Sequence, residues 1–216
     1  YKKENGIDAP PEEKEILKEP IIPEFKKVKP SKVENTVVYP EIPMAQRTNF
    51  VIDNDELGFG GAKEKFRKNM EAIRVLKECE FDHRLATPEE QKILSEYVGW
   101  GGLADAFDET KSNWANEFQE LYAALSPEEY EQARASTLTS HYTSPVIIKS
   151  MYKALENMGF SQGNILEPSC GIGNFMGLVP ESMKDSKIYG IEIDSITGRI
   201  AQQLYQRNSV AIQGYE

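Results

Sequence analysis

The sequence predicts an α/β fold in which a parallel sheet, incomplete in this chain, follows a helical module and a disordered tail. Three observations predict it. A short apolar run at 164–167 ends before a proline, a glycine-rich turn follows, and a second apolar run at 187–193 contains an acid near its end. Strand, glycine turn, helix and strand in this order form one nucleotide-binding βαβ unit. Residues 210–212 are expected to be a third strand.

Residues 1–45 are expected to be a tail or linker. Seven of the 12 prolines lie there, interleaved with Lys and Glu, so the segment cannot bury enough apolar surface to order itself. Residues 46–139 are expected to form the helical module, and 140–216 the first part of the sheet domain. A short edge strand is predicted at 49–53 and a helix at 62–80, where apolar side chains recur at helical spacing.

Two further helices of the module have clear start signals. Thr87-Pro88 and Ser126-Pro127 are each followed by Glu at the third helical position, which is the pattern of a capping box. Between them, 113–125 should be helical. Gly99-Trp100-Gly101-Gly102 interrupts the module, and its three glycines predict a tight turn. That turn either holds the indole as an anchor that fixes the helical module to the sheet domain, which we favour, or presents it to a base for stacking.

The sheet domain should begin with a helix opened by Ser144 and Pro145 and ended by Gly159. A second helix, capped by Ser195, should follow the second strand, and a short one should span 175–179. The side chains expected to point inward are Ile147, Met151, Ala154, Leu155 and Met158 on the first helix, and Ile196, Ile200 and Leu204 on the one after the second strand.

The residues around the glycine turn indicate which nucleotide binds there. Gly171, Gly173 and Gly177 are spaced one residue too widely for the dinucleotide fingerprint, and no Lys or Arg lies in this turn. The carboxylate of Glu167 would repel a diphosphate but would suit the ammonium of a methionine moiety. Glu192, at the end of the second strand, can accept hydrogen bonds from both ribose hydroxyls. These demands fit S-adenosylmethionine better than a dinucleotide.

Three segments in the same order resemble the N-6 adenine-specific DNA methyltransferases. E-P-S-C-G-I-G-N-F (167–175) and Y-G-I-E-I-D (189–194) are similar to the first two motifs of that family, and H-Y-T-S-P (141–145) is similar to the element that touches the cofactor's carboxylate. The Gly99–Gly102 segment resembles the large methylase–helicase proteins of bacterial conjugative elements and phages. The resemblance implies a Rossmann-like domain that binds S-adenosylmethionine through Tyr142, Thr143, Glu167, Pro168, Ser169, Cys170, Gly171, Gly173, Phe175, Glu192 and Ile193.

The family's catalytic tetrapeptide, of the N/D-P-P-Y type, does not occur in this sequence. The only Pro-Pro pair is Pro10-Pro11, which is followed by glutamate. The resemblance therefore implies the cofactor-binding portion of a DNA adenine methyltransferase, inactive alone, with its catalytic motif beyond this fragment and its catalytic residues not in it. After the third strand, where the family usually places an Asp against the adenine ring, this sequence offers Tyr215 or Glu216.

Three alternatives stay open. The same cofactor motifs serve methyltransferases that modify RNA or the amide of glutamine. A second possibility is a non-catalytic nucleotide-fold scaffold of a mobile-element DNA-processing protein. A third is a nicotinamide oxidoreductase domain, which a cofactor titration would distinguish.

Charge and cysteine usage set further expectations. The net charge is −10, and residues 46–216 offer no basic stripe, so DNA should be gripped mostly by regions outside this fragment. The two cysteines, Cys79 and Cys170, lack metal-ligand spacing, and neither His83 nor His141 has a ligand partner nearby in sequence, so no metal is expected. Reduced thiols and the absence of a membrane-spanning run or signal peptide predict a cytoplasmic protein that does not bind membranes.

Overall fold

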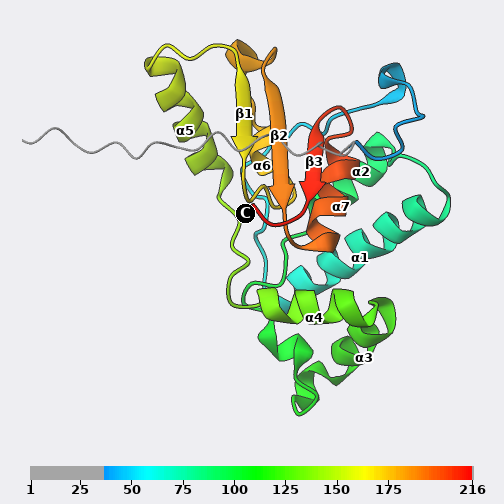
Figure 1. Cartoon of the computed structure of the whole chain (residues 1–216). Coiled ribbons are helices and arrows are strands. Elements are labelled where there is room, and N and C mark those ends of the chain that lie inside the picture. The colour runs from blue at the N-terminus through cyan, green and yellow to red at the C-terminus, as the bar shows by residue number, and fades with distance from the viewer. Residues whose placement is uncertain (1–36, 216) are drawn as a thin grey trace, which may run out of the picture. The chain divides into compact units, whose positions relative to one another are not determined.

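Three parallel strands form one sheet, as predicted, and their order is β1–β2–β3 (Figure 1). β1 (Asn164–Glu167) pairs with β2 (Lys187–Glu192), which pairs with β3 (Ser209–Ile212). Parallel neighbours need crossover connections, and these contain α6 (Asn174–Gly177), the 3₁₀ turn η4 (Glu181–Met183) and α7 (Ser195–Leu204). The computed structural model describes residues 37–215. Residues 1–36 of the predicted tail therefore lie outside the described residues.

The helical module is present, and both predicted capping boxes are confirmed. The side chains of Thr87 and Ser126 each accept a hydrogen bond from the third helical amide, and the Glu at that position accepts one from the N-cap amide. Together these bonds satisfy two otherwise unpaired amides at each helix start. The module's elements are η1 (Met44–Gln46), α1 (Ala62–Phe81), α2 (Pro88–Ser95), η2 (Ala104–Phe107), η3 (Ser112–Trp114), α3 (Ala115–Ala124) and α4 (Pro127–Ser136).

The edge strand predicted at 49–53 does not form. Asn49 makes an isolated antiparallel bridge to Tyr205. The amide of Phe50 donates to the carbonyl of Leu204 at 2.8 Å, and that of Ile52 donates to the carbonyl of Gly177 at 3.0 Å. The segment is extended, but its hydrogen bonds go to the ends of two different helices and not to a neighbouring strand, so no ladder develops.

The prediction of which side chains of α5 (Pro145–Asn157) point inward is largely wrong. Ile147, Met151 and Met158 are 54%, 50% and 73% exposed, whereas Ile148 and Tyr152 are buried. The helix carries apolar side chains around most of its circumference, so the sequence pattern alone does not determine which face packs. The hydroxyl of Tyr152 donates to the carbonyl of Phe175 at 2.8 Å, which orients the helix toward α6.

Trp100 is buried, as expected for an anchor. Its side chain is 1% exposed and packs edge-on against the rings of Phe107 and Tyr97, with ring centroids 5.3 Å and 6.3 Å away. The indole is therefore not presented for stacking on a base. The turn that carries it fits closely, because a Cβ added at Gly101 would lie 1.9 Å from the carbonyl oxygen of Ser140.

Helix α7 joins the helical module to the sheet. Its ten residues include seven buried ones: Ile196, Thr197, Gly198, Ile200, Ala201, Gln203 and Leu204. It packs against α1, α2 and α4 on one side and against β2 and β3 on the other. A single apolar cluster consequently runs from Phe66 in α1 to Val210 in β3. The regions 46–139 and 140–216 thus share one hydrophobic core.

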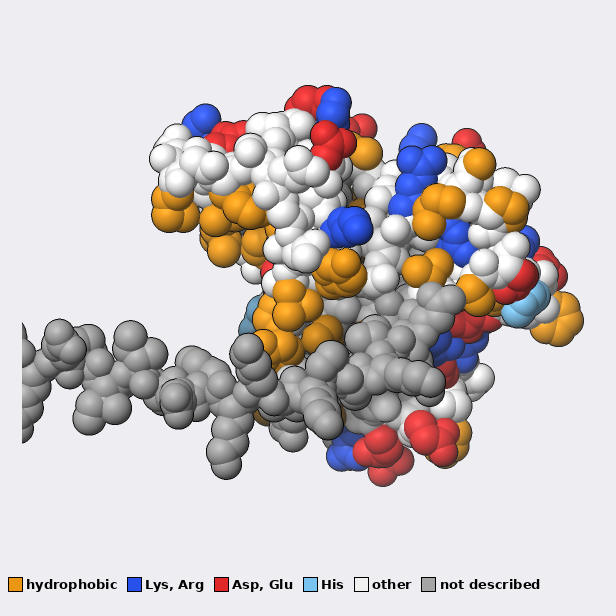
Figure 2. Space-filling model, turned by 45° about the horizontal axis from the view of Figure 1, so that its top comes forward, with side chains coloured by type: hydrophobic (Ala, Val, Ile, Leu, Met, Phe, Trp, Pro, Cys, Tyr) orange, Lys and Arg blue, Asp and Glu red, His pale blue; other side chains and the backbone are white. Residues whose placement is uncertain are grey.

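The opposite face of the sheet carries exposed apolar side chains. Leu166 and Tyr189 are register partners in β1 and β2, so they point to the same face, and they are 49% and 39% exposed. Ile147 and Met151 on α5 are exposed as well. Figure 2 shows apolar side chains, in orange, on the part of the surface where α5 and the strands lie. The buried face contains Ile188, Gly190 and Val210, which explains why only this face has a continuous core.

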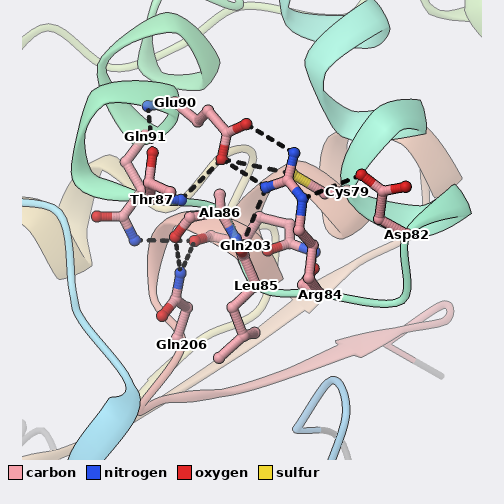
Figure 3. Close-up of polar contacts among 10 residues, drawn as sticks. All are labelled: Cys79, Asp82, Arg84, Leu85, Ala86, Thr87, Glu90, Gln91, Gln203 and Gln206. Atoms are coloured by element: carbon pink, nitrogen blue, oxygen red, sulfur yellow. Dashed lines mark hydrogen bonds and ion pairs between the residues drawn. The ribbon is translucent and has the colours of Figure 1, made fainter.

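A buried polar network connects α2 to α7 (Figure 3). Gln203 and Gln206 together satisfy the backbone of Ala86: Gln203 Oε1 accepts from its amide, and Gln206 Nε2 donates to its carbonyl, both at 2.8 Å. Beside them Arg84 forms a two-pronged ion pair with Glu90, at 2.7 Å and 2.8 Å. Because buried polar groups are costly when unpaired, this network fixes how the loop before α2 lies on α7.

The Arg84–Glu90 pair predicts a pH-dependent contribution to stability. Hydrogen bonds from Arg84 lower the pKa of Glu90 from 4.5 to about 2. A carboxyl whose pKa is lower in the folded state stabilises the fold above its unfolded pKa and loses that contribution as pH falls toward its folded pKa. We expect Glu90→Gln to cost about 1 kcal/mol at neutral pH, since both side chains are partly exposed.

This difference should shrink as the pH is lowered from about 4.5 to about 2, measured as the free energy of unfolding in urea at a series of pH values. The matched control is Glu89→Gln on the same turn of α2, which should have little effect at any pH. A cost for Glu90→Gln that is independent of pH over this range would contradict the assigned ion pair.

Candidate functional site

A small cavity lies where β1 ends and the glycine turn begins, and it contains most of the predicted site residues. Its volume is about 60 Å³. Seven of the eleven predicted residues line it: Tyr142, Thr143, Glu167, Ser169, Cys170, Gly171 and Phe175. Ligands of open parallel sheets bind at the carboxyl ends of the strands, and in Figure 1 the arrowheads of the strands point to the side of the molecule that holds α1 and α4.

The other four predicted residues lie around this cavity without lining it. Pro168 is exposed, and Ile193 is 73% exposed just beyond β2. Gly173 is buried under the ring of Tyr205. Glu192 reaches the cavity wall indirectly, because one oxygen of its carboxylate accepts a hydrogen bond from the amide of Gly171 at 2.9 Å.

The two glycines of the turn are required by packing as well as by backbone conformation. Gly171 and Gly173 have φ of 55° and 91°, in the left-handed region that favours glycine. A Cβ at Gly171 would lie 2.7 Å from the ring of Tyr142, and one at Gly173 would lie 2.4 Å from the ring of Tyr205. These glycines were expected to let a ligand approach the backbone; in the structure, aromatic side chains of the protein occupy the space beside them.

The amides of the glycine turn are already used within the protein. The amide of Cys170 donates to the carbonyl of Ile191 at 2.9 Å, and that of Gly173 donates to the carbonyl of Cys170 at 2.8 Å. The Gly171 amide donates to the carboxylate of Glu192. A phosphate cradle requires free amides that converge on the anion. The amides at these three positions are therefore not available to a diphosphate. In addition, the carboxylate of Glu192 lies where the anion would bind.

Glu192 keeps hydrogen-bonding capacity for a ligand. Its second oxygen accepts from the amide of Asp194 at 2.9 Å. A carboxylate has about four lone-pair sites, so two stay available after these two bonds. Asp194, and not Ser195 as predicted, is the N-cap of α7, and its side chain accepts from the amide of Thr197 at 2.8 Å. Both acids at the end of β2 are thereby held in fixed positions.

Burial makes the cavity unfavourable for negative charge on its own side chains. It raises the pKa of Glu167, and it raises the pKa of the Cys170 thiol to about 12, with Glu192 and Glu167 adding to that shift. Burial also raises the pKa of the Tyr142 hydroxyl. Glu167 is the only acidic or basic side chain, apart from histidine, among the residues that line the cavity. A cationic group on a ligand would offset its desolvation.

The structure adds three residues that sequence reasoning did not assign to the cavity: His141, Ile148 and Asn174. The Oδ1 atom of Asn174 is buried and has no hydrogen-bond partner among the described residues. Asn174 follows the second glycine directly, so its position in the quoted motif could have indicated it. From the sequence, His141 is interpreted as structural, with a place in the wall of the cofactor pocket left open, and it does line this cavity.

Comparison with known proteins gives two matches, both distant. The chain is 26% identical over 159 residues to the Defense against restriction protein B of Escherichia phage P1. The aligned region makes up 73% of this chain but only 6% of that protein. A crystal structure from Listeria monocytogenes, assigned to the class I S-adenosylmethionine-dependent methyltransferases, aligns with 71% of this chain and 54% of its own at 12% identity and a TM-score of 0.27. No family model matches the chain.

Within the described part of the chain, no helix combines the length and the apolar character that crossing a bilayer requires.

The two thiols should be unreactive in the folded protein. Both cysteines are free and buried, and burial raises the pKa of Cys79 to about 11 and that of Cys170 to about 12. Alkylation requires the thiolate, so we expect neither residue to react with iodoacetamide at about pH 8, and both to react once urea unfolds the chain. Mass spectrometry of the alkylated peptides measures this. Rapid native labelling of Cys170 would contradict its burial.

Proposed function

We propose that this chain is the cofactor-binding portion of an S-adenosylmethionine-dependent DNA adenine methyltransferase, whose N/D-P-P-Y-type catalytic motif is not in this sequence. The observation that carries the cofactor assignment is the state of the glycine turn. The amides of Cys170, Gly171 and Gly173 are bonded within the protein, and two carboxylates, Glu167 and Glu192, border the turn. This arrangement disfavours a diphosphate and suits a ligand with a cationic end and a ribose.

The chain's own residues fit such a cofactor. Glu167 would hold the ammonium of the methionine part, and the free lone pairs of Glu192 would accept from the ribose hydroxyls. Ile193, exposed beyond β2, would pack against the adenine. A cavity of about 60 Å³ is too small for the whole molecule, so the nucleoside would lie outside it at the exposed edge. When bound, the cofactor supplies a methyl group on a sulfonium.

The proposal that DNA is the substrate is based on the sequence motifs. The segments 141–145, 167–175 and 189–194 occur in the order used by the N-6 adenine methyltransferases. The name of the phage P1 protein refers to restriction, which concerns DNA, although the chain spans only 6% of that protein's length. With a net charge of −10, the chain is expected to leave most DNA contacts to other regions of the parent protein, which we place in the cytoplasm.

A second candidate is a non-catalytic scaffold module. The missing tetrapeptide and the acidic composition favour it over an enzyme that acts alone. The nicotinamide alternative is disfavoured because the amides of Cys170, Gly171 and Gly173 are already bonded within the protein.

Calorimetry with S-adenosylhomocysteine tests the cofactor assignment. The wild-type chain should bind it and should give no binding heat with NAD⁺. Glu192→Ala should lose about 2–4 kcal/mol of binding free energy, because a charged acceptor of two ribose hydrogen bonds is removed. Since Glu192 also holds the amides of Gly171 and Asp194, thermal unfolding of the variant must be checked in parallel.

The matched control for this measurement is Glu181→Ala, because that side chain is 83% exposed and lies in η4, outside the lining of the cavity. It should bind like the wild type. Unchanged affinity of a folded Glu192→Ala variant would refute the role of Glu192, and binding of NAD⁺ in preference would favour the oxidoreductase alternative.

A methyl-transfer assay tests whether this chain supplies only cofactor binding, with the catalytic motif elsewhere in the full-length protein. We expect this chain alone to incorporate no label from radiolabelled S-adenosylmethionine into unmethylated DNA, since it lacks the tetrapeptide that would accept from the adenine amino group. The full-length gene product containing this sequence, assayed beside it, should incorporate label. Incorporation by this chain alone would overturn the proposal. No incorporation by a full-length product that has an intact tetrapeptide would favour the scaffold.

A further inference from the structure

A second cavity adjoins the small one and extends it toward the helical module. Its volume is about 240 Å³. It shares four lining residues with the small cavity: His141, Tyr142, Thr143 and Asn174. The rest of its wall includes Lys65 from α1, Ser95 and Tyr97 at the end of α2, and Gly101 from the tryptophan turn. The helical module therefore contributes directly to the space beside the glycine turn.

The second cavity is suited to an anion. In a chain with a net charge of −10, none of the residues that line it is Asp or Glu. Lys65 lines it and is half-buried, and its ammonium has no hydrogen-bond or ion-pair partner among the described residues. Its neighbours on α1 differ in this respect, since Lys63 pairs with Glu117 at 2.6 Å and Lys68 pairs with Glu96 at 2.6 Å.

Hydrogen-bond donors without partners point to the same kind of ligand. Tyr97 is 1% exposed, lines the cavity, and has a hydroxyl with no hydrogen-bond partner among the described residues. The hydroxyl-bearing side chains of Ser140, Thr143 and Ser144 also line it. A carboxylate is an acceptor-only group with about four lone-pair sites, so it could satisfy several of these donors together with the ammonium of Lys65.

We infer that Lys65 binds the carboxylate of the amino-acid end of the cofactor, while Glu167 in the adjoining cavity binds its ammonium. This inference rests on the proposed function. Lys65 lines one of two adjoining cavities and Glu167 lines the other, and neither side chain has an ion-pair partner among the described residues. Such a pair selects a dipolar amino-acid group. The helical module is then part of the cofactor site and recognises the end of the cofactor that distinguishes it from a simple nucleoside.

The test compares two ligands that differ only at this end. S-Adenosylhomocysteine carries the amino-acid group, and 5′-methylthioadenosine lacks it. We expect Lys65→Met to weaken binding of S-adenosylhomocysteine about 10- to 100-fold, as for loss of a charge-assisted hydrogen bond, and to leave binding of 5′-methylthioadenosine unchanged. Lys92→Met is the matched control, because Lys92 is an exposed lysine on α2 that does not line this cavity. It should bind both ligands like the wild type.

Each result gives a decision. Equal weakening for both ligands, or no weakening for either, would overturn the role of Lys65 while leaving the proposed function intact. Failure of the wild-type chain to bind either ligand would instead remove the proposed function, and this inference with it. If Lys65→Met lowers affinity for a single-stranded oligonucleotide but not for S-adenosylhomocysteine, the cavity holds a nucleic-acid phosphate and the inference is wrong. Thermal unfolding midpoints equal to the wild type show that each variant is folded.

Discussion

The burial of α7 between the sheet and the helical module is the constraint on which the rest of the structure depends. Its apolar residues belong to the core on both sides, and its polar ones are paired there: Arg199 forms ion pairs with Glu80 and Glu129. Tyr205, at its C-terminal end, then covers Gly173 and Gly177 so closely that neither could carry a side chain without displacement. The shape of the glycine turn is thus set by the helix after the second strand.

This packing limits the chemistry of the site, because amides of the glycine turn already donate hydrogen bonds to groups of the protein itself. Because three amides of the turn are bonded internally, the proposed cofactor would be selected by carboxylates and by Lys65, and not by a cradle of free amides as in a phosphate-binding loop. The positive charge of Lys65 and the negative charge of Glu167 lie in two adjoining cavities. An acidic protein can therefore carry one locally cationic compartment where it needs to recognise an anion.

Local patterns predicted the elements well, because capping boxes and short apolar runs are properties of neighbouring residues. The three strands, α1, α4 and the burial of Trp100 belong to this class. Features determined by distant contacts were missed. The outward orientation of Ile147 and Met151 depends on which side of α5 packs against α6. The choice of Asp194 as the N-cap of α7 depends on where β2 ends. The approach of Lys65 to residues some 75 positions later requires the whole fold, so no sequence pattern could have indicated it.

The network around Ala86 also has a consequence for synthesis on the ribosome. Its amide and carbonyl find their partners 117 and 120 residues later in the chain. At roughly 5–20 residues per second, that delay is about 6–24 s. Throughout this interval the loop before α2 lacks its hydrogen bonds, and the apolar faces of α1 and α2 lack the helix that covers them. The first half of the described chain consequently reaches its native state only after the second half has emerged, and an interrupted translation product would expose surfaces that the finished protein keeps buried.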